Sequence, residues 1–143
     1  MCIKQLSVFI ENKPGSLADI TGLLGENDID LFSLSIADTA QFGILRAIVA
    51  DYEKARRLIA EAGYTVKLTD VLAVAVHDSP GELAGILRLL AESRNDVEYL
   101  YSSVRNAGES ALIIFRVKEP ELTARFLADK GVRLLTQEEI SVL

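Results

Sequence analysis

The sequence predicts an α+β protein made of two repeats, each with the element order β-α-β-β-α-β. Residues 12–17 and 78–83 each contain Pro-Gly, one variable residue and then Leu, and each segment follows an apolar run typical of a strand. Both segments also open an apolar pattern with helical spacing. Self-similarity at a fixed period indicates an array of modules, so we expect two domains, residues 1–70 and 71–143. Modules this small are marginally stable alone, so we expect them to pack side by side.

In the first repeat, apolar alternation predicts strands and apolar periodicity predicts helices. Asp51 is suited to cap the second helix and Gly63 to end it. A polar turn at 38–42 indicates a hairpin. The expected elements are strand 3–10, a helix of about ten residues ending near Gly25, strand 29–36, strand 43–49, a helix after Asp51, and strand 65–69.

The second repeat predicts the same order, and Pro120 stands where a first-turn helix proline belongs. The offset between the repeats is 66 residues at the Pro-Gly corner. It becomes 68 where Asn-Asp-Ile at 27–29 matches Asn-Asp-Val at 95–97, which indicates two residues inserted at the end of the first helix. We expect residues 136–143 to extend the last strand or to pack against a neighbour. The expected elements are strand 71–76, helix 80–93, strand 97–104, turn 106–108, strand 111–117, helix 120–130 and strand 132–135.

The order of elements restricts the topology of each repeat. Because crossover connections are right-handed, β-α-β-β-α-β closes into a ferredoxin-like sandwich. This is a four-stranded antiparallel sheet with both helices on one face. The other face must then be polar or meet a partner.

The Pro-Gly corner leads from a strand into a helix, where backbone N–H groups lack partners. Proline is tolerated in a first helical turn, and glycine lets another backbone or a ligand approach closely. Ser79 with Glu82 has the form of a capping box, and Ser16 with Asp19 allows a similar one. The exposed N–H groups that remain favour an anion or a carboxylate.

Charge and composition exclude several classes of function. Residues 1–70 carry seven Lys/Arg against ten Asp/Glu, and residues 71–143 carry eight against eleven, so each half has a net charge of −3. The absence of a basic face argues against nucleic acid and anionic membranes as partners. A single Cys2 and a single His77 provide no metal, redox or nucleophile constellation, and no cofactor is expected. With no signal-like segment at the start, we expect a cytoplasmic protein.

Over nearly its whole length, the chain resembles a pair of ACT domains, which are small ligand-binding modules attached to many enzymes of amino-acid metabolism. The resemblance rests on the element order, on the two corners and on the Asn-Asp-Ile step at 27–29. It implies modules that share an extended sheet and bind an effector, commonly an amino acid, at their interface. In the serine-regulated phosphoglycerate dehydrogenases, the effector is held by the corner of one module and by the strand entry of the next, which is the residue that leads into the second strand.

Carried onto this chain, the resemblance assigns ligand contacts to the two corners and the two strand entries. Asp28 and Asp96 stand where the serine-regulated dehydrogenases have Asn. In the second corner, Asp78 also replaces Asn. The ligand-binding residues implied are Asn12, Gly15, Ser16, Leu17, Asp28, Ile29, Asp78, Gly81, Glu82, Leu83, Asp96 and Val97.

The leading hypothesis is therefore a non-catalytic sensor that binds a free amino acid between the repeats. The α-carboxylate would lie on the N–H groups of residues 15–17 or 81–83. The ammonium would face Asp28 or Asp96, or the side-chain oxygen of Asn12 or Asp78. We expect the protein to form a homodimer. We also expect it to regulate a metabolic enzyme in trans, because the sequence shows no catalytic domain that it could regulate in cis.

Other functions compete with this hypothesis. A ligand-free module that dimerises or docks on a metabolic enzyme is the main rival. Acylphosphatase-like chemistry would need an arginine in the phosphate-cradling loop, and the corner loops have none. A metal carrier would need paired Cys or His ligands, and RNA recognition would need aromatic-rich strands and a basic balance.

Overall fold

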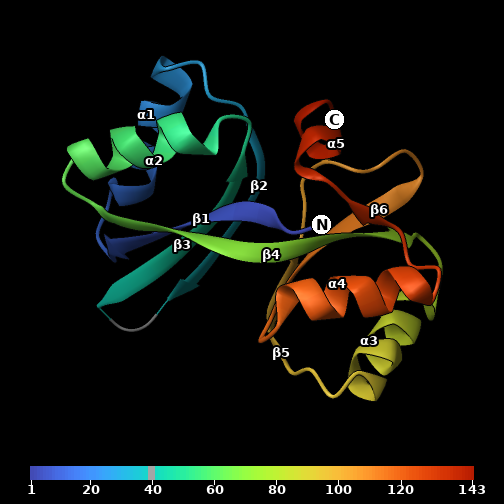
Figure 1. The fold of residues 1–143 in the computed structure, drawn as a ribbon. Coiled ribbons are helices and arrows are strands. Elements are labelled where there is room, and N and C mark those ends of the chain that lie inside the picture. The colour runs from blue at the N-terminus through green and yellow to red at the C-terminus, as the bar shows by residue number, and fades with distance from the viewer. Residues whose placement is uncertain (39–40) are drawn as a thin grey trace. The chain divides into compact units, whose positions relative to one another are not determined.

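The computed structural model describes residues 1–38 and 41–143, and its contacts group them into two compact units (Figure 1). The first unit comprises residues 4–69, and the second comprises residues 1–3 together with residues 70–143. Two of the residues in the expected turn at 38–42, Thr39 and Ala40, lie outside the described residues. The division into domains of residues 1–70 and 71–143 stays a prediction.

In the first unit, the strand order is β2-β3-β1-β4, and the pairs of β3 with β1 and β2 are antiparallel. Both helices of this unit lie on one face of these strands in Figure 1. This order is the one expected for a ferredoxin-like repeat. The elements are β1 (Ile3–Glu11), α1 (Ser16–Glu26), β2 (Leu31–Asp38), β3 (Phe42–Val49), α2 (Tyr52–Glu61) and the start of β4 (Thr65–His77).

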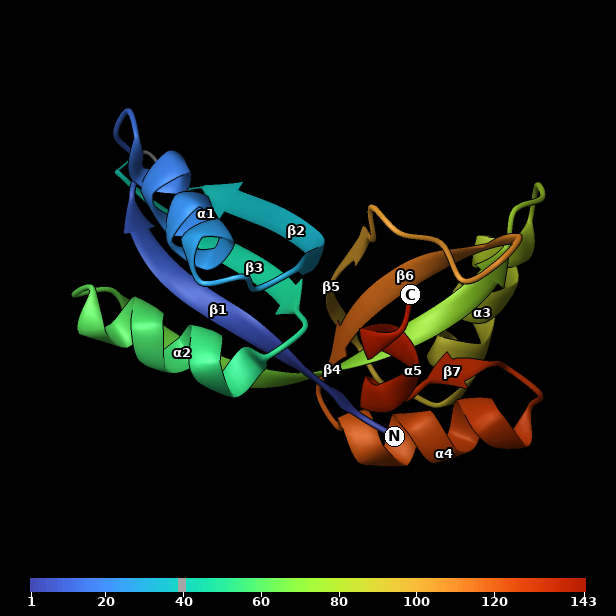
Figure 2. The same cartoon turned by 90° about the horizontal axis from the view of Figure 1, so that it is seen from above.

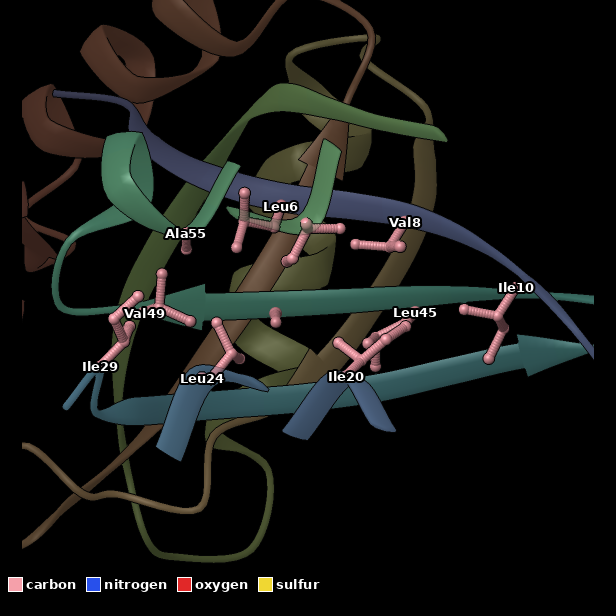
Figure 3. Packing of buried hydrophobic residues seen from close by; sticks show 11 residues of the cluster. Leu6, Val8, Ile10, Ile20, Leu24, Ile29, Leu45, Val49 and Ala55 are labelled. Atoms are coloured by element: carbon pink, nitrogen blue, oxygen red, sulfur yellow. The ribbon is translucent and has the colours of Figure 1, made fainter. Parts of the chain in front are cut away.

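The core of the first unit lies between that sheet face and the helices (Figure 3). Alternate residues of β1 and every third or fourth residue of α1 supply its side chains, as strand and helix periodicity require. Burying this apolar surface is the main favourable term in folding. The buried residues of the cluster are Leu6, Val8, Ile10, Ile20, Leu24, Ile29, Leu45, Ala47, Val49, Ala55 and Ile59.

In the second unit, the strand order is β5-β6-β4-β7, and β4 with β6, β4 with β7 and β5 with β6 pair antiparallel. This repeats the order of the first unit, because β4 takes the place of β1 and β7 the place of β4. Its core cluster includes Leu72, Phe115 and Leu127. The elements are the end of β4, α3 (Glu82–Glu92), β5 (Val97–Ser102), β6 (Ser110–Val117), α4 (Pro120–Asp129), β7 (Leu134–Leu135) and α5 (Gln137–Ser141).

Strand pairing locates the two-residue difference between the repeats. Leu31 of β2 pairs with Val49 of β3, and Val97 of β5 pairs with Val117 of β6. The offset is thus 66 residues from Leu31 to Val97 and 68 residues from Val49 to Val117. The helices α1 and α3 both have 11 residues. The insertion therefore lies in the second hairpin, and the expected insertion at the end of the first helix is wrong, because a three-residue match does not determine register.

Local signals for helix ends are confirmed in three places. The side chain of Asp51 accepts a hydrogen bond of 3.0 Å from the backbone N–H of Lys54, which caps α2. Pro120 lies in the first turn of α4. Gly63 follows α2 with φ of 96°, a left-handed conformation that glycine adopts at no steric cost.

The structure corrects two expectations for strands: two strands expected to be separate are continuous, and one of the two alternatives for residues 136–143 is wrong. Residues 65–69 and 71–76 form one continuous strand, β4, because no glycine or proline interrupts residues 65–77. Residues 136–143 do not extend the last strand. Thr136 and Glu139 instead form a capping box that opens the short helix α5, and Ile140 of this helix is buried. The Thr-x-x-Glu motif is visible in the sequence and could have predicted this helix.

Cys2 lies in the second unit, where the N-terminus lies beside α4 (Figure 2). The amino nitrogen of Met1 is 3.8 Å from Oε2 of Glu121 on that helix. Burial, followed by a hydrogen bond to the Glu121 carboxylate, raises the pKa of the Cys2 thiol from 9.0 to about 12. The same hydrogen bond lowers the pKa of Glu121. The thiol is therefore held protonated in the folded chain.

Alkylation of Cys2 by iodoacetamide at pH 8 is expected to be much slower in the folded chain than in urea, because only the thiolate reacts. Glu121→Gln removes a negative charge beside the thiol, so this variant should react faster when folded. Since folding raises this pKa, the thiol's contribution to stability is fully present below pH 9.0 and is lost as the pH rises through about 12. Equal rates in the folded and unfolded chains would contradict the assignment.

Candidate ligand site at the first corner

The two corners have nearly the same backbone conformation. Gly15 is the N-cap of α1 with φ of 89° and ψ of −14°, and Gly81 is the N-cap of α3 with φ of 90° and ψ of −12°. A β-carbon at either position would meet no atom within 4 Å, so the positive φ, rather than a close approach, requires glycine. The prolines at 14 and 80 precede the N-caps and lie just outside the helices.

The expected capping boxes are wrong, because a glycine occupies each N-cap position. Neither N-cap makes a side-chain hydrogen bond. The side chain of Ser79 reaches the side chain of Glu82, at 3.4 Å between Oγ and Oε1, and not a backbone N–H group of the first turn. Ser16 is the first residue of α1 and is buried. Ser16 lies one residue after the N-cap and Ser79 two residues before it, so neither serine occupies the capping position.

The first helical turn keeps unpaired backbone donors at both corners. At the first corner, the N–H of Ser16 donates to the carbonyl of Lys13 at 3.3 Å, and that of Asp19 donates to the carbonyl of Gly15 at 2.9 Å. Within the part of the chain that the structure describes, the N–H groups of Leu17 and Ala18 have no partner. Unpaired donors at a helix N-terminus attract negative charge.

The same arrangement recurs at the second corner. The N–H of Glu82 donates to the carbonyl of Ser79 at 3.3 Å, and that of Gly85 donates to the carbonyl of Gly81 at 3.0 Å. The N–H groups of Leu83 and Ala84 are left without a partner among residues 1–38 and 41–143. The expected cluster of exposed N–H groups is therefore present twice.

A cavity of about 420 Å³ adjoins the first corner. It lies wholly within the first unit, where the end of β1, the start of α1, the start of β3 and the connection from α2 to β4 meet. Figure 2 shows the loop that leaves β1 and enters α1 at this end of the sheet. The cavity is lined by Phe9, Ile10, Glu11, Lys13, Ser16, Asp19, Phe42, Ala62, Gly63, Tyr64 and Thr65.

Positively and negatively charged side chains line this cavity. Nζ of Lys13 lies 3.2 Å from Oε2 of Glu11, and both side chains are mostly exposed. Asp19, one turn into α1, adds a second carboxylate. Ser16 and Asp19 bracket Leu17 and Ala18, so the unpaired N–H groups lie between two lining residues. The corner therefore has unpaired donors in the first turn of α1, and the adjoining cavity has a lysine and two carboxylates in its lining.

The residues predicted for the first site are only partly brought together. Of them, Ser16 lines the cavity. Asn12 is exposed, and its N–H donates to the carbonyl of Gln41 at 3.0 Å. Leu17 is 38% exposed at the corner beside it. Sequence reasoning missed the aromatic and charged lining residues, because the chain folds Phe42 and residues 62–65 against the corner from distant positions.

The predicted strand entry lies far from the corner within one unit. Asp28 follows α1 in a left-handed conformation, with φ of 58°, and Ile29 is buried in the core. The 11 residues of α1 span about 16 Å at 1.5 Å per residue. One unit therefore does not bring its corner and its strand entry into one site, and the predicted pairing of these elements stays a prediction.

In the second unit, Glu82 is exposed at the start of α3 and Leu83 packs against the core. Asp78 and Asp96 are exposed, and Val97 begins β5. The offset of 66 makes Arg94 the counterpart of Asp28, and Arg94 also has a positive φ, of 57°. The match of Asp28 with Asp96 is therefore wrong as a structural equivalence, and the two strand entries carry opposite charges.

No group of three or more His, Cys, Asp or Glu side chains in the described residues is arranged to hold a metal ion. No helix in that part of the chain has the length and apolar character needed to cross a membrane.

Known proteins share this architecture. Protein BT0572 from Bacteroides thetaiotaomicron is similar at 36% sequence identity, with a TM-score of 0.92 over 100% of this chain and 98% of that chain. The regulatory subunit of aspartate kinase from Thermus thermophilus is similar in fold at 16% identity, with a TM-score of 0.63 over 88% of this chain and 91% of that chain. The regulatory subunit of aspartate kinase from Thermus flavus is also similar in fold, at 16% identity. Its TM-score is 0.60 over 90% of this chain and 92% of that chain. No curated protein matches.

The family described as an ACT domain pair matches residues 1–143. This match agrees with the two repeats of β-α-β-β-α-β, with the strand order in each unit and with the paired Pro-Gly corners. The chain belongs to the ACT domain pair family.

Proposed function

We propose that this chain is a non-catalytic regulatory protein that binds a free amino acid at the corner between β1 and α1. The observation that carries the proposal is a corner where the N–H groups of Leu17 and Ala18 are unpaired and where the adjoining cavity is lined by positively and negatively charged side chains. Membership in a family of ACT domain pairs supports a regulatory role. The fold shared with aspartate kinase regulatory subunits agrees with it.

The chemistry of a free amino acid suits these groups. Its α-carboxylate would accept hydrogen bonds from the N–H groups of Leu17 and Ala18, where the helix dipole favours negative charge. Lys13 would add a cation beside the carboxylate. The α-ammonium would face Asp19 or Glu11, since charge-assisted hydrogen bonds are the stronger ones. A molecule with only one of these charges would leave the opposite partners without a ligand.

The proposed output is regulation in trans. Binding would change the affinity for a metabolic enzyme or the assembly of a homodimer, and a coupling free energy of about 1–3 kcal/mol is typical. We place the protein in the cytoplasm, where free amino acids are made and consumed. The corner of the second repeat, with Gly81 and Leu83, has the same unpaired donors and is proposed as a separate carboxylate site.

A thermal-shift screen of the full chain against the twenty amino acids tests this function. One or two amino acids are expected to raise the melting temperature selectively, because a ligand at 100 times its dissociation constant stabilises by about 2.7 kcal/mol. Each amino acid is compared with its decarboxylated amine, which carries no carboxylate and should have no effect. A flat response, together with persistent self-association, would overturn the proposal in favour of a ligand-free docking module.

A further inference from the structure

We propose that the buried hydroxyl of Ser16 selects an amino acid whose side chain is polar and neutral, that is, a hydroxyl or an amide. The inference rests on the proposed function and adds the ligand's side chain. Ser16 is the first residue of α1, is only 4% exposed and lines the cavity beside the corner. A ligand in this cavity can therefore reach a polar group that the surface of the unit conceals.

Ser16 faces the sheet rather than the solvent. It shares the buried face of α1 with Ile20 and Leu24, which follow at intervals of four residues and point at the sheet in Figure 3. Ile10 of the core cluster and Tyr64, which packs against that cluster, line the same cavity. Residues of β1, of α1 and of the connection into β4 thus border it on the side of the sheet that the helices cover.

The hydroxyl of Ser16 has no hydrogen-bond partner in the part of the chain that the structure describes. Other hydroxyls on helices have one. Oγ1 of Thr21 donates to the carbonyl of Leu17 at 2.8 Å, and Oγ1 of Thr123 donates to the carbonyl of Glu119 at 2.8 Å. Both reach a carbonyl four residues earlier. Because Ser16 opens α1, no turn of its own helix precedes it, and its hydroxyl is left to a group that enters the cavity.

A buried hydroxyl without a protein partner makes a site selective. Water that enters the cavity can bond to Ser16, but a ligand that fills the cavity displaces this water. An apolar group at this place leaves the hydroxyl unpaired, which costs free energy. A hydroxyl or an amide replaces the lost hydrogen bond. Sites with such a polar group discriminate against analogues that lack the bonding group.

The lining favours a neutral polar side chain over a charged one. In the proposed function the α-carboxylate and the α-ammonium have other partners, so the hydroxyl of Ser16 remains for the side chain. Lys13, Glu11 and Asp19 give the lining a net charge of −1, which disfavours an acidic side chain. A cationic side chain would bring its charge to a buried neutral hydroxyl, at a cost in desolvation.

The second repeat shows that the turn does not require a serine at this position. With the offset of 66 residues, Glu82 is the counterpart of Ser16, and each follows a left-handed N-cap glycine as the first residue of its helix. Glu82 is exposed, whereas Ser16 is buried. A glutamate in the first turn is also favoured by the helix dipole. The serine is therefore not needed to build the corner.

Isothermal titration calorimetry of the full chain tests the inference with pairs of amino acids of similar shape. The pairs are L-threonine with L-valine, L-serine with L-2-aminobutyrate, and L-asparagine with L-leucine. In at least one pair, we expect the polar member to bind about tenfold or more tightly than its apolar partner, a difference of about 1.4 kcal/mol. L-aspartate, the charged analogue of L-asparagine, should bind more weakly than L-asparagine.

Ser16→Ala removes the hydroxyl and introduces a residue well suited to a helix. It should weaken binding of the preferred polar amino acid by about tenfold and leave its apolar partner unchanged, so the preference within the pair disappears. Thr21→Val is the matched control, because it removes a hydroxyl of the same helix that already bonds to Leu17 and does not line the cavity. This variant should keep the preference. Circular dichroism checks that both variants are folded.

The outcomes separate this inference from the proposed function. If an apolar, acidic or basic amino acid binds best, the inference is wrong and the amino-acid sensor stands. If Ser16→Ala weakens both members of a pair equally, Ser16 contacts an α-group instead of the side chain, and the inference is wrong. An unchanged preference in Ser16→Ala would also overturn it. If no amino acid binds, the proposed function fails and this inference with it.

Discussion

Phe115→Ala is expected to lower the free energy of unfolding by about 3–5 kcal/mol, the usual cost of removing a buried aromatic side chain. Phe115 is 1% exposed and belongs to the core cluster of the second unit. It lies on β6, paired with Leu72 on one side and Leu100 on the other. The loss combines the lost burial of the ring with the cavity that remains. Urea unfolding followed by circular dichroism measures it.

The size of this effect is large against the total stability of a small protein, about 5–15 kcal/mol. Leu122→Ala removes apolar atoms from an exposed position of α4 in the same unit and should change the stability by less than about 0.5 kcal/mol. The comparison therefore separates burial from hydrophobicity. Similar losses in the two variants would show that Phe115 does not lie in a packed core.

Gly15→Val is expected to weaken effector binding by more than tenfold and to destabilise the chain. The φ of Gly15 is 89°, and a left-handed conformation costs an ordinary residue about 1–2 kcal/mol, with β-branched residues the least suited to it. The corner would change its turn to relieve this strain. The N–H groups of Leu17 and Ala18 would then lose the arrangement that receives a carboxylate. Calorimetry with the effector measures the affinity, and thermal unfolding measures the stability.

Gly22→Ala is the matched control in the same helix. Gly22 lies inside α1, and a β-carbon there would meet no atom within 4 Å. Alanine in a helix interior is more stable than glycine by roughly 0.5–1 kcal/mol, so this variant should be more stable and bind as before. The equivalent change in the second repeat is Gly81→Val. Unchanged affinity in both valine variants would exclude the corners from the binding site.

Short-range signals predicted most of the fold. Asp51 caps α2 and Pro120 starts α4, as expected, because a cap or a first-turn proline acts within one helical turn. The repeated corner predicted two modules of the same order. Where two local signals competed, the prediction failed. Ser16 and Ser79 suggested capping boxes, but the left-handed glycines at 15 and 81 occupy the N-cap positions.

Register could not be predicted from the same signals. The match of residues 27–29 with 95–97 suggested an insertion at a helix end, whereas pairing of Leu31 with Val49 and of Val97 with Val117 places the insertion in the second hairpin. Which residues face each other across strands depends on the whole sheet, because the side-chain period is two and many alignments satisfy it. Arg94, the structural counterpart of Asp28, was found only in this way.

The sequence by itself determined the α+β class, the two repeats and the Pro-Gly corners with their unpaired N–H groups, because periodicity, helix caps and glycine conformation act over a few neighbouring residues. Only the tertiary structure decided which side chains surround the first corner. Phe9, Phe42 and Tyr64 are separated along the chain and line one cavity because the end of β1 lies beside the start of β3 and the connection into β4. A ligand site depends on such long-range proximity, which no local pattern encodes.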